Sequence, residues 1–199
     1  MGGGEGGAVS AEPGIVRKRW RTIVVDPPWA YRDKLRMGSG PKHRGADAHY
    51  TTSSTAALRD LPIGEYAERD AHLYLWVTNA FLEDGHALAR AWGFQQRTMI
   101  TWCKTQIGMG HYFRNSTEHA LFCVRGKLAL LRKDLPTHFT APRGRHSEKP
   151  QAFYDMVETA SPGPYLDVFA RRHRMLWDVA GNEVYSAIPE LAARAADGP

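Results

Sequence analysis

The sequence predicts a single α/β domain with a mostly parallel β-sheet covered by helices on both faces. Three observations support this fold class. Short β-branched or aliphatic runs alternate along the chain with apolar residues at helical spacing, as in βαβ units. The 199 residues have 43% hydrophobic content, which suffices for one sizeable core. The first apolar run, residues 22–25, is β-branched throughout, which is typical of a strand buried on both faces.

The two ends of the chain differ in composition from its middle. Residues 1–14 and 188–199 are rich in Gly, Ala and polar residues, which predicts disordered tails around one domain at 15–187. No segment approaches the ~20 consecutive apolar residues of a membrane span. The Gly-rich start lacks the basic and apolar regions of a signal peptide. We therefore expect a cytoplasmic protein that contacts no membrane.

Charge and cysteine content narrow the class of function. The net charge is +5 and the sequence pI is near 9.3, which favours a polyanionic partner. The two cysteines, Cys103 and Cys123, fit a reducing compartment and provide no zinc framework. We expect no metal site.

The stretch Asp26-Pro27-Pro28-Trp29 directly follows the first predicted strand. Its prolines have a fixed φ and donate no backbone hydrogen bond, so we expect a rigid turn with carbonyls free of competing N–H groups. A carboxylate, a stiff carbonyl and a flat ring together favour binding of a planar ring with an exocyclic amine, such as adenine or cytosine. Asp-Pro after a strand is also a common turn, and Trp is often a core residue.

The remaining elements are predicted from periodicity and from residues that start and stop helices. A long basic loop at 32–49 either contacts phosphates or is a solvated insertion. Helices are expected up to Leu58, from Phe81 to Trp92 with a stop at Gly93, and from Glu148 past Val157. Strands are expected at 73–77, 98–104, 118–124, 165–170 and 175–180, and polar loops at 105–117 and 135–146.

Polar side chains stand where several of these strands end. Asp26, Asn79 and Lys104 follow or close successive predicted strands. Ligands of such sheets bind beyond the carboxyl ends of the strands. We therefore expect these three side chains at one site.

Four motifs occur in a characteristic order: DPPW at 26–29, running into Ala30-Tyr31, EKP at 148–150, LDVFAR at 166–171 and WDVAGNE at 177–183. In this order the chain resembles the adenine-N6 methyltransferase family of the mRNA N6-methyladenosine writers and their bacterial and phage relatives. These are beta-class amino methyltransferases, circular permutants in which the DPPW-type motif precedes the methyl-donor motif. The resemblance implies a Rossmann-like methyltransferase fold, with S-adenosylmethionine as cofactor and S-adenosylhomocysteine as product.

The resemblance also implies roles for individual residues. The catalytic residues are Asp26, Pro27, Pro28 and Trp29, with the Asp26 carboxylate and the Pro27 carbonyl accepting the amine hydrogens and Trp29 stacking on the base. Residues implied to bind the cofactor are Asp26, Lys149, Asp167, Phe169, Arg171, His173, Asn182 and Glu183, of which Lys149 binds its carboxylate and Glu183 its ribose. The glycines usual after the aromatic are replaced here by Arg171 to Arg174, and Arg174 stands where asparagine is common.

The implied substrate is adenine in a nucleic acid, with DNA slightly favoured over RNA. The residues assigned to substrate binding are Tyr31, Arg32, Lys42, His43, Arg44, Tyr50, Asn79, Lys104, Arg114, Arg143 and Arg145. Specificity would come from the basic loops, a homodimer or an accessory subunit. A non-catalytic nucleic-acid-binding subunit and cytosine-N4 methylation remain as alternatives, although the cytosine motif usually begins with Ser.

Overall fold

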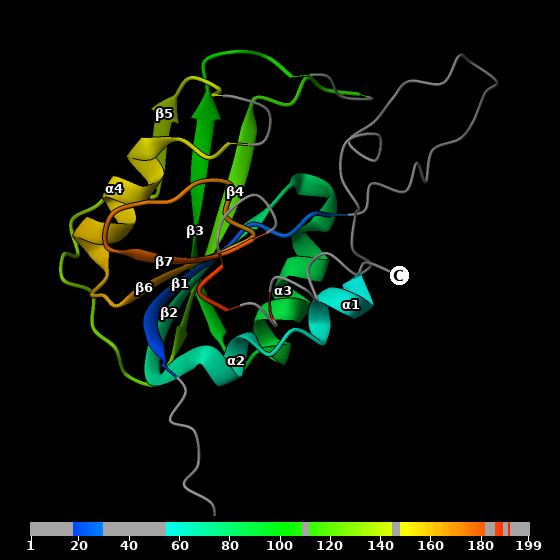
Figure 1. The fold of residues 1–199 in the computed structure, drawn as a ribbon. Coiled ribbons are helices and arrows are strands. Elements are labelled where there is room, and N and C mark those ends of the chain that lie inside the picture. Colours follow the sequence, from blue (N-terminus) through cyan, green and yellow to red (C-terminus); the bar gives the residue numbers. More distant parts are fainter. Residues whose placement is uncertain are drawn as a thin grey trace, which may run out of the picture.

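The structure is a computed structural model that describes residues 18–29, 55–108, 112–144, 148–181, 186–188 and 191. The predicted tail at 1–14 and the predicted loop at 32–49 lie outside this part of the chain. Within it, the strands form one sheet in the order β5-β3-β4-β2-β1-β6-β7 (Figure 1). The strands are β1 (Trp20–Val25), β2 (Ala67–Val77), β3 (Gln95–Lys104), β4 (Thr117–Arg125), β5 (His138–Ala141), β6 (Tyr165–Val168) and β7 (Trp177–Ala180).

The sheet is mixed but mostly parallel, as predicted. β1 lies in its interior and runs parallel to both β2 and β6. β3 and β5 are also parallel, as are β6 and β7, whereas β4 is antiparallel to β2 and to β3. β4 follows β3 directly in the order of strands along the chain, and an antiparallel pair of this kind needs no crossover helix.

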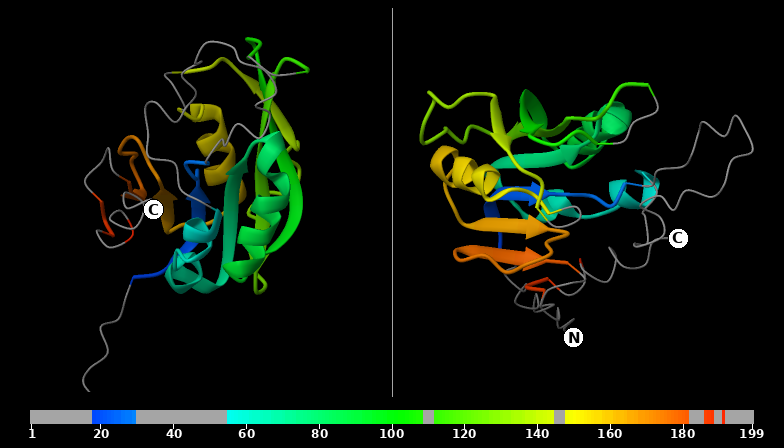
Figure 2. Two further views of the ribbon diagram at one scale, coloured as in Figure 1. Left: turned by 90° about the vertical axis from the view of Figure 1, so that its right-hand side faces the viewer. Right: turned by 90° about the horizontal axis from the view of Figure 1, so that it is seen from above.

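Helices cover both faces of the sheet, which confirms the prediction (Figures 1 and 2). The helices α1 (Thr55–Arg59), α2 (Ile63–Tyr66) and α3 (Leu82–Ala91) contribute to one buried cluster, and α4 (Gln151–Ala160) contributes to a second. Ile23 and Val25 of β1 belong to the first cluster and Val24 to the second. Successive side chains of a strand point to opposite faces, so a strand buried on both faces has to be apolar throughout.

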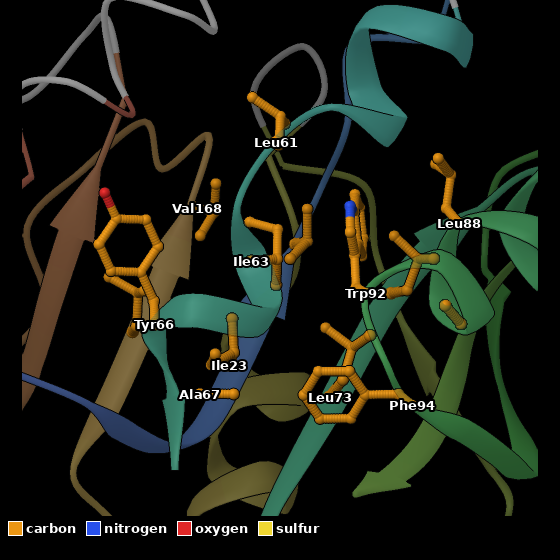
Figure 3. Close-up of a cluster of buried hydrophobic side chains, with 14 of the residues drawn as sticks. Ile23, Leu61, Ile63, Tyr66, Ala67, Leu73, Leu88, Trp92, Phe94 and Val168 are labelled. Atoms are coloured by element: carbon orange, nitrogen blue, oxygen red, sulfur yellow. The ribbon is translucent and has the colours of Figure 1, made fainter. Parts of the chain in front are cut away.

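The first cluster holds β1 in place beneath the helices (Figure 3). It gathers Ile23 of β1 and Leu73 of β2 with Ile63 of α2 and Leu88 of α3, all of them buried. Full burial of an aliphatic side chain of this size contributes about 1.5–3 kcal/mol to stability. The strand that ends directly before Asp26 is therefore anchored from this face by tightly packed apolar side chains.

The end of α3 matches the prediction from sequence. The Gly93 N–H donates to the Arg90 carbonyl, and Gly93 has a φ of +83°. This left-handed conformation favours glycine because it has no Cβ. α3 is preceded by a 3-10 turn, Asn79–Phe81, so the regular α-helix begins at Leu82 and not at Phe81.

Several predicted bounds were wrong. The polar loop expected at 135–146 contains β5, which pairs in parallel with β3 from His138 to Ala141. β2 begins at Ala67, earlier than the expected 73, because Ala67 pairs with Trp20 of β1 and Ala71 pairs with Arg125 of β4, on either side of the polar residues 68–70. β7 begins at Trp177, since Met175 and Leu176 are exposed and Leu176 has a left-handed φ of 69°.

Two residues beyond the predicted domain boundary at residue 187 pack into the core. Ile188 and Leu191, both assigned to a flexible tail, are buried members of the first cluster. Isolated apolar residues in an Ala-rich segment carry no periodic signal, so their burial follows from the tertiary structure. No helix within the described residues is long and apolar enough to cross a membrane.

Candidate active site

The register of the strands brings their polar ends to one edge of the sheet. Val25 pairs with Leu75 of β2, Val77 pairs with His119, and Cys103 of β3 pairs with Thr117 of β4. The ends of β1, β2 and β3 and the start of β4 therefore meet. As predicted for a sheet of this class, the chemistry-bearing side chains gather beyond the carboxyl ends of its parallel strands.

Four side chains of alternating charge form an ion-pair chain at this edge. The Lys149 ammonium lies 2.7 Å from Asp26 Oδ2 and 3.6 Å from Glu118 Oε2, and the Lys104 ammonium lies 2.5 Å from Glu118 Oε1. Lys149 stands directly before Pro150, the N-cap residue of α4, and its nitrogen lies 5.1 Å from the Trp76 ring centre. The structure thus joins Asp26 and Lys149, which are distant in sequence.

Burial and neighbouring charges perturb the three central groups of this chain. Burial raises the pKa of Asp26 above its ordinary value, against the opposing effect of Lys149. Burial would also raise the pKa of Glu118, but Lys149 and Lys104 outweigh it and hold that pKa below its ordinary value. For Lys149, burial acts to lower the pKa, and the two carboxylates raise it above the ordinary lysine value. Lys149 therefore stays charged and is shared between both acids.

Glu118 is a site residue that the sequence analysis missed. It begins the strand segment EHALFCV, where an acidic residue before an apolar run reads as an exposed strand end. The sequence offered one signal: Lys104 ends one predicted strand and Glu118 begins the next predicted strand along the chain. Only the antiparallel register of β3 and β4 shows that the two side chains meet.

The two prolines form a tight turn after β1. The Trp29 N–H donates to the Pro27 carbonyl at 2.9 Å, so this carbonyl is not free of competing N–H groups, contrary to the expectation from sequence. A carbonyl oxygen has two lone pairs, and one stays available. Pro27 is buried and Pro28 half-buried. The turn can therefore still present an acceptor next to Asp26.

Trp29 lies in the core in this structure. Its side chain is 6% exposed, its ring stacks on Phe81 with the centres 4.9 Å apart, and its Nε1–H donates to the Trp76 carbonyl at 3.1 Å. The ring therefore packs the turn against the end of β2. Stacking on a base would require the ring to be uncovered, and that role stays a prediction.

A hollow of about 320 Å³, counted with its space open to solvent, adjoins Asp26. Its walls come from the end of β1, the start of α4 and the end of β6 with the segment that follows. Predicted cofactor residues among its lining are Asp26, Lys149, Asp167, Phe169 and Arg171, and Glu148, Tyr154, Ala170, Arg172 and Arg174 complete it. Predicted His173 is exposed and is not part of the lining.

The turn after β6 is held without the usual glycines. Phe169 adopts a left-handed φ of 66°, and its N–H donates to the Ala180 carbonyl of β7 at 2.6 Å. Gly181 lies so close to Ala170 that an added Cβ would overlap the Ala170 carbonyl oxygen. A non-glycine residue in this conformation costs about 1 kcal/mol or more, and such strain gathers at ligand-binding sites.

Arg174, which departs from the expected asparagine, packs into the wall of the hollow. Its guanidinium carbon lies 3.5 Å from the centre of the Tyr154 ring, and it donates to Gln151 at the start of α4. The Tyr154 hydroxyl in turn donates to Asp167 Oδ2 at 2.9 Å. Burial raises the pKa of Asp167 to about 7, with the Tyr154 hydrogen bond opposing the rise.

The residues assigned to substrate binding do not share one environment: some are buried in ion pairs or hydrogen bonds and others are exposed. Lys104 is 4% exposed and bound to Glu118, so it does not present its charge at the surface. Asn79 Oδ1 accepts from His119 Nε2 at 2.9 Å, which orients that ring. Arg114 and Arg143 are exposed. The predicted residues Tyr31, Arg32, Lys42, His43, Arg44, Tyr50, Arg145, Asn182 and Glu183 lie outside the described residues.

Metal ligands do not gather in the part of the chain that the structure describes. There, His, Cys, Asp and Glu nowhere form a group of three that could hold an ion. The functional groups that the described residues bring to the site are carboxylates, ammonium and guanidinium groups, and one proline carbonyl.

Comparison with known proteins agrees with the resemblance found in the sequence motifs. The sequence model of the MT-A70 family matches residues 20–183. The Type II methyltransferase M.MunI of Mycoplasma sp is 28% identical over 188 residues, which cover 86% of this chain and 81% of that protein. The human N(6)-adenosine-methyltransferase catalytic subunit METTL3 is 26% identical over 88% of this chain and 30% of its own length. An Arabidopsis thaliana N(6)-adenosine-methyltransferase MT-A70-like protein is 28% identical over 81% of this chain and 23% of its own length.

Proposed function

The chain belongs to the MT-A70 family of methyltransferases, and on this premise we propose that it methylates N6 of adenine in a nucleic acid. The observation that carries the proposal is the placement of the Asp26 carboxylate in the lining of the hollow, 2.7 Å from the Lys149 ammonium, with Pro27 next to it in the chain. The chain spans most of M.MunI but less than a third of METTL3.

Two adjacent acceptors suit the chemistry of an aromatic amine. The amine is a poor nucleophile because its lone pair is delocalised into the ring. Asp26 and the second lone pair of the Pro27 carbonyl would accept its two hydrogens, which localises the nitrogen lone pair and aims it in one direction. Asp26 has to be ionised to accept, and its pairing with Lys149 favours the ionised form.

The residues that line the hollow fit S-adenosylmethionine. When bound, this cofactor supplies an electrophilic methyl group on a sulfonium. Lys149 and Arg171 would hold its carboxylate, Asp26 and Asp167 offer acceptors for its ammonium and hydroxyl groups, and the Phe169 ring offers an apolar surface.

Lys149 would connect the two substrates. It carries three N–H donors, and in this structure two carboxylates compete for them. A further N–H of Lys149 would hold the carboxylate of the cofactor, while the hydrogen bond to Asp26 Oδ2 is kept and favours ionised Asp26. The other oxygen of Asp26 would then accept from the amine.

We favour DNA over RNA as the polymer. M.MunI, of which the chain covers 81%, is named a Type II methyltransferase. RNA is the second candidate, because METTL3 is named an N(6)-adenosine-methyltransferase. A base within a duplex would have to be flipped out, whereas an unpaired base would need only unstacking. Sequence specificity would come from exposed basic loops, a homodimer or an accessory subunit.

The test is methylation by the full chain and by Asp26→Asn. Labelled S-adenosylmethionine is incubated with single-stranded and duplex DNA and RNA, and the products are digested to nucleosides. We expect N6-methyladenine, and a loss of about 100-fold or more in Asp26→Asn, with S-adenosylhomocysteine binding largely kept in calorimetry. Asp134→Asn is the matched control, because Asp134 is an exposed aspartate paired with Arg132.

The outcomes separate the alternatives. Full turnover in Asp26→Asn would show that Asp26 has no role in the reaction and would contradict the proposal. Methylated cytosine among the products would identify the exocyclic amine of cytosine as the group that is methylated. Strand binding without any donor-dependent methylation by the parent chain would indicate a non-catalytic nucleic-acid-binding subunit.

A further inference from the structure

We propose that Tyr112 and Phe113 form a stacking platform for the bases of an unpaired nucleic-acid strand. The inference rests on the proposed function, because it names the single strand as the substrate class of the same site. The two rings are 89% and 88% exposed. Adjacent large apolar side chains left this open to solvent mark a surface that another molecule covers.

The platform is joined to the candidate active site by two closely spaced segments, residues 104–108 and 115–116, which we call the neck. It lies in the connection from β3 to β4, which Figure 1 shows extending beyond the ends of both strands. The Lys104 N–H donates to the Ser116 carbonyl at 2.7 Å, and the Gly108 N–H donates to the Asn115 carbonyl at 2.8 Å. The two arms approach so closely that a Cβ on Gly108 would lie 2.8 Å from the Asn115 oxygen.

This neck fixes where a bound strand would run. Its two segments continue directly from Lys104 and from Glu118, the two members of the ion-pair chain that are farthest from Asp26 along it. Phe113 is five residues from Glu118, a reach of at most about 18 Å along extended chain. A strand that stacks on the platform is therefore held within a few nucleotides of the carboxylate that would accept the target amine.

Charge around the platform favours a nucleic acid over a protein. Arg114 directly follows the two rings, and the Arg143 backbone N–H donates to Gln106 Oε1 at 3.0 Å, which places Arg143 against the same connection. Residues 105–116 and 142–144 contain Arg but neither Asp nor Glu. Surfaces that combine stacking rings with cations hold single strands by base stacking and phosphate contacts, and a duplex would keep its base faces covered.

The test measures strand binding directly, without donor and without turnover. Fluorescence anisotropy of a labelled single-stranded oligonucleotide is compared between the full-length parent and Tyr112→Ala/Phe113→Ala. Loss of stacking on one to two bases predicts roughly tenfold or greater weakening. Tyr112→Trp/Phe113→Trp should bind as the parent does, because any aromatic ring stacks. Leu131→Ala is the matched control, since Leu131 is also exposed, at 59%, and is bonded to the far end of α4.

The readouts distinguish this inference from the proposed function. Weakened binding by the double-alanine variant supports the platform even if no methylation is found. Unchanged strand binding would overturn it, as would a parent chain that binds duplex and single strand equally well. If the same variant instead changes the oligomeric mass in light scattering and leaves strand binding intact, the rings belong to a subunit interface and the platform is excluded.

Discussion

The ammonium nitrogen of Lys149 lies 2.7 Å from Oδ2 of Asp26 and 3.6 Å from Oε2 of Glu118. One cation therefore serves the proposed reactive carboxylate and a second acid that is itself paired with Lys104. Any change in how strongly Glu118 attracts Lys149 alters the ionisation of Asp26. The ion-pair chain can thus be tested through the pH dependence of the reaction.

Glu118→Gln should lower the pKa of Asp26. The negative charge of Glu118 raises that pKa, and its removal also leaves Lys149 to Asp26 alone. The proposed reaction requires ionised Asp26, so the acid limb of the kcat/KM profile should move to lower pH. Lys104→Gln should move the same limb to higher pH, because Glu118 would then draw Lys149 away from Asp26. Shifts of the same sign in both variants would contradict this account.

Lys149→Met should destabilise the fold by about 2 kcal/mol. It leaves Asp26 and Glu118 as neighbouring partly buried acids without their shared cation. The loss, measured by urea unfolding, should be smaller near pH 5 than near pH 8, because protonation relieves an unpaired buried carboxylate. The control is Lys18→Met, which breaks an exposed ion pair with Asp178 and should cost less than about 1 kcal/mol.

Asp167→Asn should stabilise the fold more at high pH than at low pH. In the folded protein burial raises the pKa of Asp167 to about 7, against an ordinary value of 3.8. Between these values the folded state holds a proton that the unfolded chain releases, so stability falls as pH rises through this window. Asparagine keeps an acceptor for the Tyr154 hydroxyl and cannot ionise. The gain in Tm over the parent should therefore be larger at about pH 8 than at about pH 5.

Trp29→Ala should cost about 3–5 kcal/mol of unfolding free energy, since it empties a buried site beside Phe81. Trp29→Phe should cost less, because an aromatic ring is kept and mainly the hydrogen bond to the Trp76 carbonyl is lost. Urea unfolding of both variants provides the measurement. A Trp29→Ala variant as stable as the parent would show that the ring is not a packing residue and would favour base stacking.

Local patterns in the sequence were sufficient for most elements of the fold. β1, β3, β4, β6, α3 and α4 lie close to their predicted ranges, because strand and helix periodicity and the stop at Gly93 are properties of neighbouring residues. β5 was missed because its four residues have no apolar run, and they become a strand only by pairing with β3. The same holds for the polar start of β2.

For the site, the sequence by itself determined that an acid, two prolines and a tryptophan follow a buried strand, and that a lysine opens a later helix. The tertiary structure alone decided how they are used. It joined Lys149 to Asp26, added Glu118 and Lys104 to the same ion-pair chain, and placed Trp29 against Phe81. Ion pairs and burial depend on which distant segments become neighbours, and that neighbourhood is set by sheet order and register, which no local pattern encodes.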